Sequence, residues 1–383
     1  MSERREAGIP PSSEYLDDFL AAGVYDPDAP NAAAWLELLD FLVEEVGASI
    51  PEMVHACEHG GEFSLGAFRT LSAGRDRFTL SEAATQAAID TGFALQLWRS
   101  AGFPEPRSFE RRFGPADVDM FRLFEMLAEF VERELVVQLA RTMGEAVSRI
   151  ADAEVALLRS NIEAPLAVTS QYVDVARTYM QVAAELFPRV AEALDTLHRH
   201  HLLAIGRRYS EVGAQPSALN VVQLAVGFAD LAGFTGLSSE LEVSDLALMI
   251  ARFEATTGDV VTSAGASVVK RIGDAVMFVS NAPGVGCALS LGLIEACTAA
   301  GLPKLRVGLS FGDVMVRQGD FYGPTVNLAA RLVASAEPGT ALTDRSLYER
   351  LARARLGYTF VPVGRLTLAG FSESVEAYQL LRA

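Results

Sequence analysis

The pattern of apolar residues changes near residue 206, and this change limits what the chain can form. From residue 14 to 205, apolar side chains recur every three or four positions, as in Phe121, Phe124 and Leu127. That spacing is typical of amphipathic helices. After residue 220, short β-rich runs alternate with helical patterns. The sequence therefore predicts an all-α domain followed by an α+β domain.

The segment between the two patterns is typical of an interdomain linker. Residues 206–220 are polar and rich in turn-forming residues, and the chain of 383 residues is long enough for two domains. We expect an all-helical domain over residues 1–205, a linker over 206–220 and an α+β domain over 221–383.

Charge and composition exclude several classes of protein. Residues 1–210 carry 33 acidic and 19 basic side chains, a net charge of −14, which disfavours binding to nucleic-acid phosphates. No run of 18 apolar residues predicts a membrane span, and the first residues lack the apolar stretch of a signal peptide. The three cysteines have no paired spacing typical of a disulfide framework or a zinc site. We expect a cytoplasmic protein with no membrane span and no nucleic-acid partner.

The first candidate segment is Phe-Ala-Asp-Leu-Ala-Gly-Phe-Thr at residues 228–235. An apolar strand ends at Asp230, and a turn with a glycine leads into a helix. Such a turn places a carboxylate beside free backbone N–H groups, which suits a divalent cation and a phosphate. A helix-capping aspartate would give the same pattern, so this segment alone does not decide between the two interpretations.

The second segment, residues 268–279, predicts a hairpin of two apolar strands. Asp274 follows a glycine in its turn, where aspartate is most often structural. Lys270 interrupts a strand of Val and Ile and is one of only two lysines in the chain, against 30 arginines. A lysine there either protects a sheet edge or contacts a ligand.

The third segment begins at Asp320 and continues into a helix that Pro324 starts. Asn327 and Arg331 are four residues apart, so they share one face of that helix. A guanidinium beside an amide suits an anionic ligand rich in oxygen, although a solvated surface pair is the commoner explanation of such a spacing.

Together the three segments resemble the catalytic domain of the class III adenylyl and guanylyl cyclases across residues 221–383. The resemblance rests on Phe-x-Asp-x-x-Gly-Phe-Thr, Lys-x-x-Gly-Asp and Asp-x-x-Gly-x-x-Val-Asn-x-Ala-x-Arg, in this order. It implies a ferredoxin-like α+β fold and conversion of ATP to cyclic AMP and pyrophosphate. The helical half resembles, more loosely, the regulatory region of mycobacterial soluble cyclases that respond to pH.

The resemblance also implies a role for each motif residue. Asp230 and Asp274 would hold two divalent metal ions, Mg²⁺ or Mn²⁺. Lys270 and Asp320 would read adenine and reject guanine, whose hydrogen-bonding pattern at N1 and position 6 is reversed. The residues that would stabilise the transition state are Asn327 and Arg331.

Phosphate binding is the one place where the sequence departs from the family. The family usually has a basic residue where Ala369 stands, and Arg365 is near enough in sequence to replace it. Backbone N–H groups would also hold the phosphates; they belong to Leu231, Ala232, Gly233, Phe234 and Thr235.

The resemblance further implies a homodimer whose two sites each combine residues from both chains. Two other functions agree with parts of the sequence. One is a DNA-binding regulator, because residues 78–104 have a helix-turn-helix look with Gly92 at the turn. The other is a pseudoenzyme that dimerises and binds nucleotide without turnover.

Regulation is expected to involve histidine. All five histidines precede residue 202, and three of them, His198, His200 and His201, cluster just before the predicted linker. Histidine changes its charge between about pH 5 and 8, so this cluster is either a pH sensor or a solvated helix end.

Overall fold

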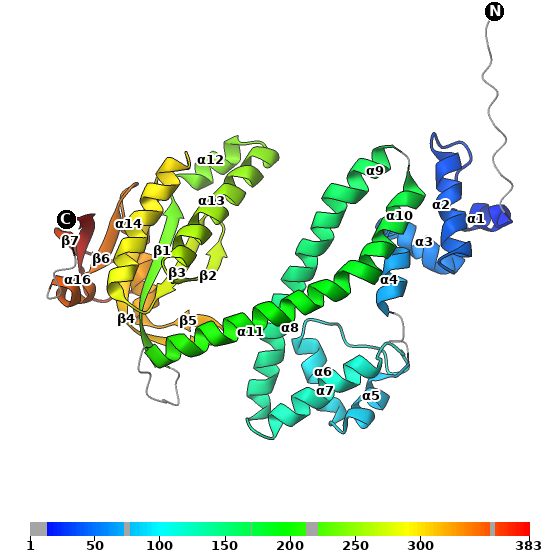
Figure 1. Cartoon of the computed structure of the whole chain (residues 1–383), viewed down its shortest axis with the longest axis horizontal. Helices are drawn as coiled ribbons and strands as arrows, with labels where there is room; N and C mark the ends of the chain where they lie inside the picture. Colours follow the sequence, from blue (N-terminus) through cyan, green and yellow to red (C-terminus); the bar gives the residue numbers. More distant parts are fainter. Residues whose placement is uncertain (1–13, 73–76, 170, 212–220, 353–356) are drawn as a thin grey trace, which may run out of the picture. The chain divides into compact units, whose positions relative to one another are not determined.

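The computed structural model describes residues 14–72, 77–169, 171–211, 221–352 and 357–383, which divide into two units, Met1–Arg199 and His200–Ala383 (Figure 1). Among its described residues, the first unit forms helices and one isolated β-bridge, and the second unit combines helices with a sheet. This agrees with the predicted order of an all-α region and an α+β region. Within the described residues, no helix combines the length and the apolar composition needed to cross a membrane.

The first unit builds two separate apolar cores. Phe19, Leu39 and Met53 lie in one core, and Phe113 and Phe121 lie in the other. The helices are α1 (Leu16–Ala22), α2 (Ala32–Glu44), α3 (Ile50–His59), α4 (Leu65–Ser72), α5 (Leu80–Ala87), α6 (Thr91–Ser100), α7 (Pro115–Ala128), α8 (Arg133–Leu158), η1 (Arg159–Glu163), α9 (Ala164–Val168), α10 (Tyr172–Gln181), η2 (Val182–Leu186) and α11 (Phe187–Glu211).

The two short helices of the predicted helix-turn-helix are present, but the turn between them does not lie at Gly92. Helix α5 ends at Ala87, and its C-cap residue Ala88 takes the left-handed conformation with φ 57°, whereas Gly92 lies inside α6. The Asp90 carboxylate caps α6 by accepting a hydrogen bond from the Phe93 N–H at 2.9 Å. Arg99 is the one basic residue of α6, so a DNA-binding role for this helix lacks a basic stripe.

The segment expected to be a linker is partly helical. Helix α11 runs through Gly206 and ends at Glu211, so residues 206–211 extend the helix and correct the expectation of a linker there. A single glycine costs a helix only about 1 kcal/mol, which the arginines and other helix formers around it offset. Residues 212–220 lie outside the described residues.

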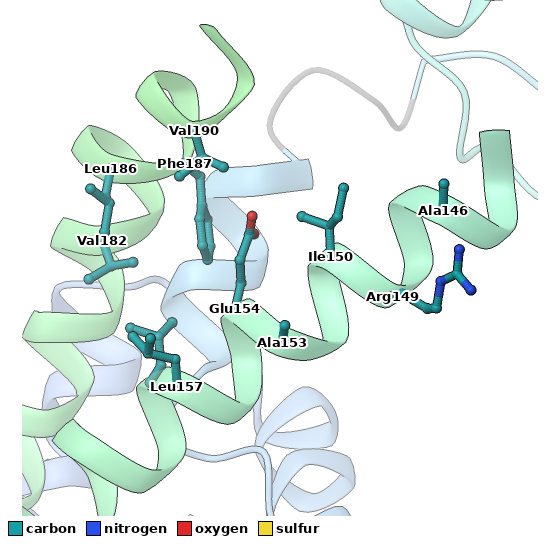
Figure 2. A pocket seen from close by; sticks show the side chains of 11 residues that line it. Ala146, Arg149, Ile150, Ala153, Glu154, Leu157, Val182, Leu186, Phe187 and Val190 are labelled. Carbon is teal, nitrogen blue, oxygen red and sulfur yellow. The ribbon is translucent and has the colours of Figure 1, made fainter. Parts of the chain in front are cut away.

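An apolar pocket of about 620 Å³ lies inside the first unit (Figure 2). Helix α8 lines it with Ile150 and Leu157, and the chain from η2 into α11 adds Phe187. Two charged side chains, Arg149 and Glu154, also line it. None of the motif residues of the second unit belongs to this pocket.

The second unit contains one mixed sheet with the strand order β2-β3-β1-β4-β6-β8-β7, and β5 pairs with β4. Its strands are β1 (Val221–Leu231), β2 (Ser267–Ile272), β3 (Ala275–Ser280), β4 (Leu305–Arg317), β5 (Asp320–Tyr322), β6 (Ala341–Asp344), β7 (Tyr358–Leu366) and β8 (Val375–Arg382). Its helices are α12 (Phe234–Glu240), α13 (Val243–Ser263), α14 (Pro283–Ala299), α15 (Pro324–Ser335) and α16 (Arg345–Ala352).

Strand β1 is buried on both of its faces. Ala225 and Ala229 belong to a core shared with α13 and α14, and Leu224 and Val226 belong to a core shared with α15. Because successive side chains of a strand point to opposite faces, a strand covered on both sides must be apolar nearly throughout. This explains the almost unbroken apolar run before Asp230.

Helix α15 packs directly onto the backbone of β4. A Cβ atom on Gly308 would lie 2.2 Å from the Val333 nitrogen and 2.3 Å from the Ala329 carbonyl oxygen. A Cβ atom on Gly312 would lie 2.8 Å from the Thr325 hydroxyl. The two glycines therefore permit the close approach of helix and strand that fixes where α15 lies.

We predict that Gly308→Ala lowers the free energy of unfolding by at least about 2 kcal/mol, because the added methyl meets helix backbone that has no room to move. Gly292→Ala in α14 is the matched control. Its Cβ would make only an ordinary contact of 3.7 Å, and alanine favours helix, so its stability should stay within about 1 kcal/mol of the parent. Urea unfolding followed by circular dichroism measures both. Equal stabilities of the two variants would contradict the packing argument.

Candidate active site

Two carboxylates meet at the end of β1. Asp230 lies one residue before the end of that strand, and Asp274 lies in the turn between β2 and β3, after Gly273 with φ 60°. The Leu231 N–H donates to the Asp274 carbonyl at 3.3 Å, which ties the turn to the strand. Burial and, secondarily, the neighbouring Asp230 carboxylate raise the pKa of Asp274. The end of β1 and the β2–β3 turn thus bring the Asp230 and Asp274 carboxylates close together.

Arg306 is the cation that faces this acidic pair. It lies opposite Asp230 in the register of β1 and β4, and the two side chains form an ion pair. The Nε atom of Arg306 is buried without a hydrogen-bond partner among the described residues. Sequence reasoning missed Arg306, yet the signal that singled out Lys270 was present here too, because Arg306 is a charged residue inside an apolar strand.

The acidic pair has the donor chemistry of a divalent-cation site. Hard cations such as Mg²⁺ and Mn²⁺ bind carboxylate oxygens, and two adjacent carboxylates with one guanidinium leave a local excess of negative charge. Burial is the main cause of the raised pKa of Asp274, and repulsion by the neighbouring Asp230 carboxylate adds to it. Asp230 and Asp274 therefore fit the metals that the sequence motif implies.

Lys270 and Asp320 form a second pair, from β2 and β5. The Lys270 Nζ lies 2.5 Å from Asp320 Oδ2, and the Phe321 N–H donates to Asp320 Oδ1 at 2.8 Å. Both side chains remain partly exposed, at 39% for the lysine and 26% for the aspartate. The residues are 50 positions apart in sequence, and the fold leaves an ammonium and a carboxylate together at the surface.

Asn327 and Arg331 lie together on the exposed face of α15. The opposite face of the helix buries Ala329 and Leu332 against the sheet. Among the described residues Arg331 has no ion-pair partner, so its guanidinium is available for an anion. The predicted four-residue spacing therefore produces the expected shared face.

Two of the five backbone N–H groups expected to bind phosphate already have acceptors within the fold. The Leu231 N–H is used by Asp274, and the Ala232 N–H donates to the Lys304 carbonyl at 2.8 Å. For the other three expected donors, the N–H groups of Gly233, Phe234 and Thr235, no backbone acceptor outside the helices is found among the described residues. Arg365 is exposed on β7, at the opposite end of the sheet from β2.

The motif residues of one chain thus form three groups rather than one cluster. The acidic pair lies at the end of β1, the Lys270–Asp320 pair spans β2 and β5, and Asn327 and Arg331 lie on α15. Within the part of the chain that the structure describes, no ion pair or hydrogen bond joins the acidic pair to either of the other groups.

Comparison with known proteins covers both units. The adenylate and guanylate cyclase catalytic domain family matches residues 218–382. An uncharacterized protein of Mycobacterium tuberculosis is 34% identical over 370 residues, which span 95% of this chain and 94% of that protein. An adenylate cyclase of Streptomyces coelicolor is 32% identical over 282 residues, 73% of each chain. A pH-sensitive adenylate cyclase of Mycobacterium tuberculosis is 26% identical over 381 residues, 96% of this chain and 92% of that protein.

Proposed function

Because the chain belongs to the class III family of adenylate and guanylate cyclases, we propose that it converts ATP to 3′,5′-cyclic AMP and pyrophosphate. The observation that carries the proposal is the Lys270–Asp320 pair, which offers a donor and an acceptor side by side. That pair complements adenine, and the acidic pair of Asp230 and Asp274 complements the metal–triphosphate end of the substrate. The divalent metals that this family generally uses suit these carboxylates.

Base selection follows from the hydrogen bonds that each base offers. Adenine has an acceptor at N1 and an amino group at position 6, so Lys270 donates to N1 and Asp320 accepts from the amino group. Guanine presents a protonated N1 and a carbonyl at position 6. With guanine bound, the ammonium would face a donor and the carboxylate would face an acceptor, and both would lose their partners.

The reaction needs no nucleophile from the protein. The ribose 3′-oxygen of ATP attacks the α-phosphorus, the bond from that phosphorus to the bridging oxygen breaks, and pyrophosphate leaves. Two divalent metals bound by Asp230 and Asp274 would favour loss of the 3′-hydroxyl proton and balance the charge of the triphosphate. Asn327 orients the ribose, and the Arg331 guanidinium donates to the phosphoryl oxygens as their negative charge grows.

A homodimer reconciles this chemistry with the separation of the three groups. In our proposal each site takes Asp230 and Asp274 from one chain, and Lys270, Asp320, Asn327 and Arg331 from the other. A twofold-symmetric pair then has two equivalent sites, since every chain carries both sets. Arg365 also belongs in this proposal, as a phosphate contact that replaces the basic residue missing at Ala369.

The first unit regulates the second in our proposal. The relative named as a pH-sensitive cyclase aligns along 96% of this chain, which includes the helical region. His198, His200 and His201 are exposed on α11 beside the ion pair of Asp195 and Arg199. In this proposal, protonation of the three histidines adds positive charge to α11 and so biases an equilibrium between two conformations.

We predict that Asp274→Ala and Asn327→Ala each reduce cyclic AMP production to near background, and that mixing the two proteins restores about a quarter of the parent turnover. Half of the dimers would be mixed, and each mixed dimer would have one intact site of two. A radiolabelled ATP assay measures the product. Retention of more than about a tenth of the activity by either single variant would contradict its assigned role.

The control for this experiment is a mixture of the Asp274→Ala protein with the Asp230→Ala protein. Both substitutions damage the same half of the site, so mixing should restore nothing. A pull-down with two different tags reports whether the chains exchange. Exchange without recovery in the first mixture would rule out shared sites while leaving the enzymatic activity itself intact.

Lys270→Gln should lower the preference for ATP over GTP, expressed as the ratio of kcat/KM values, by at least about tenfold. The neutral amide of glutamine can both donate and accept hydrogen bonds, so it can accept a hydrogen bond from the protonated N1 of guanine. Lys304→Gln is the matched control because Lys304 is the other lysine of the chain, is exposed, and contributes its backbone carbonyl rather than its side chain to the fold. An unchanged ratio in Lys270→Gln would remove Lys270 from base selection.

The regulatory proposal predicts different pH profiles for the full chain and for residues 211–383. Between pH 5.5 and 8 the ratio of their turnover numbers should change by at least about threefold, because the fragment contains no histidine. The full chain with His198, His200 and His201 changed to Gln should follow the fragment. If that variant keeps the profile of the full chain, the sensor lies elsewhere.

A further inference from the structure

The C-terminal turn of α3 gathers three side chains with ligand atoms for a metal ion. His55, Glu58 and His59 are all exposed, and their ligand atoms lie within 4.8 Å of one another. The spacing of three and four residues puts them on one helix face, and the two imidazole rings lie 4.3 Å apart between centroids. The opposite face of α3 buries Met53 and Ala56 in the core of the first unit, so the cluster points to solvent.

A backbone contact prepares His59 as a ligand. Its Nδ1 lies 2.8 Å from the His55 carbonyl oxygen. A carbonyl only accepts, so Nδ1 is the donor in this contact, and in the neutral ring the lone pair is then on Nε2. Histidines that bind metals are typically oriented in this way, by donating the second ring nitrogen to a carbonyl or carboxylate.

The neighbouring ionisable groups are engaged elsewhere. Glu52 closes the capping box of α3 and forms an ion pair with Arg69 at 2.9 Å. Cys57 on the same helix is partly buried, unlike the three exposed side chains of the cluster, and does not belong to it. The available donor set on this helix is therefore two imidazoles and one carboxylate.

We propose that His55, Glu58 and His59 bind one Zn²⁺ ion, with water completing a four-coordinate shell. Donors around Zn²⁺ lie about 2.0–2.2 Å from the ion, so the three side chains, whose ligand atoms lie within 4.8 Å of one another, would converge on a common centre by side-chain rotation. Imidazole suits Zn²⁺, whereas Mg²⁺ keeps to oxygen ligands, so this site differs in metal preference from the acidic pair of the second unit. The bound ion would stabilise the last turn of α3 against fraying.

The test measures Zn²⁺ bound to the full chain by equilibrium dialysis and metal analysis, in the presence of excess Mg²⁺. Mg²⁺ competes for Asp230 and Asp274 but not for a site built on imidazole. The parent protein should bind one more Zn²⁺ per chain than the double variant His55→Gln/His59→Gln. Glu58→Gln should weaken binding by at least about tenfold.

The matched control is the chain with His198, His200 and His201 changed to Gln, which removes exposed histidines of the same chemistry from another helix. It should bind as much Zn²⁺ as the parent. Circular dichroism checks that the variants remain folded, and Co²⁺ substitution gives an independent optical signal that the double variant should lose. Equal Zn²⁺ binding by the parent and the double variant, or loss of binding in the control alone, would overturn the proposal.

Discussion

The catalytic unit depends on the burial of β1 from both sides. The strand is hydrogen-bonded to β3 and β4 on its two edges, and helices α13, α14 and α15 supply the cores above and below it. A strand enclosed in this way has a fixed register, because a slip by one residue would exchange the two sets of buried side chains. This fixed register places Asp230 beside Asp274 and Arg306. Packing far from the acidic pair therefore determines the geometry of the pair.

Much of the fold was predictable where the sequence has a strong period or a motif with turn residues. The expected strand before Asp230, the hairpin around Asp274 and the helix after Pro324 are all present. The three-residue strand β5 and the short helix α16 were not predicted, because short elements depend on tertiary packing more than on periodicity. The last turn of α11 was predicted as linker for a related reason, since polar residues with one glycine suit a surface helix and a loop equally well.

The sequence motifs propose the residues of the candidate site but do not show which of them are in contact. The family resemblance proposes a shared role for Lys270 and Asp320, and their direct contact, across 50 residues of sequence, follows from the pairing of β5 with the sheet. Arg306 was overlooked because the resemblance drew attention to its own motif positions. The use of the Leu231 and Ala232 N–H groups inside the fold could not be foreseen, because a sequence pattern does not show which backbone donors already have partners.

The net charge around Asp230 and Asp274 connects metal binding with nucleotide binding in the proposed site. Asp230, Asp274 and Arg306 together carry one net negative charge when all three are ionised, so the group attracts cations and by itself repels a triphosphate. Divalent cations would reverse the sign of that region. Metal binding and nucleotide binding should therefore favour each other, as linkage requires when each ligand is bound better in the presence of the other. Position 369 is alanine, and two of the expected backbone donors already have partners. In the proposed site, the bound cations would therefore contribute phosphate affinity in place of the missing basic side chain. In the proposed site, Arg365 and the N–H groups after Ala232 would orient the triphosphate rather than attract it.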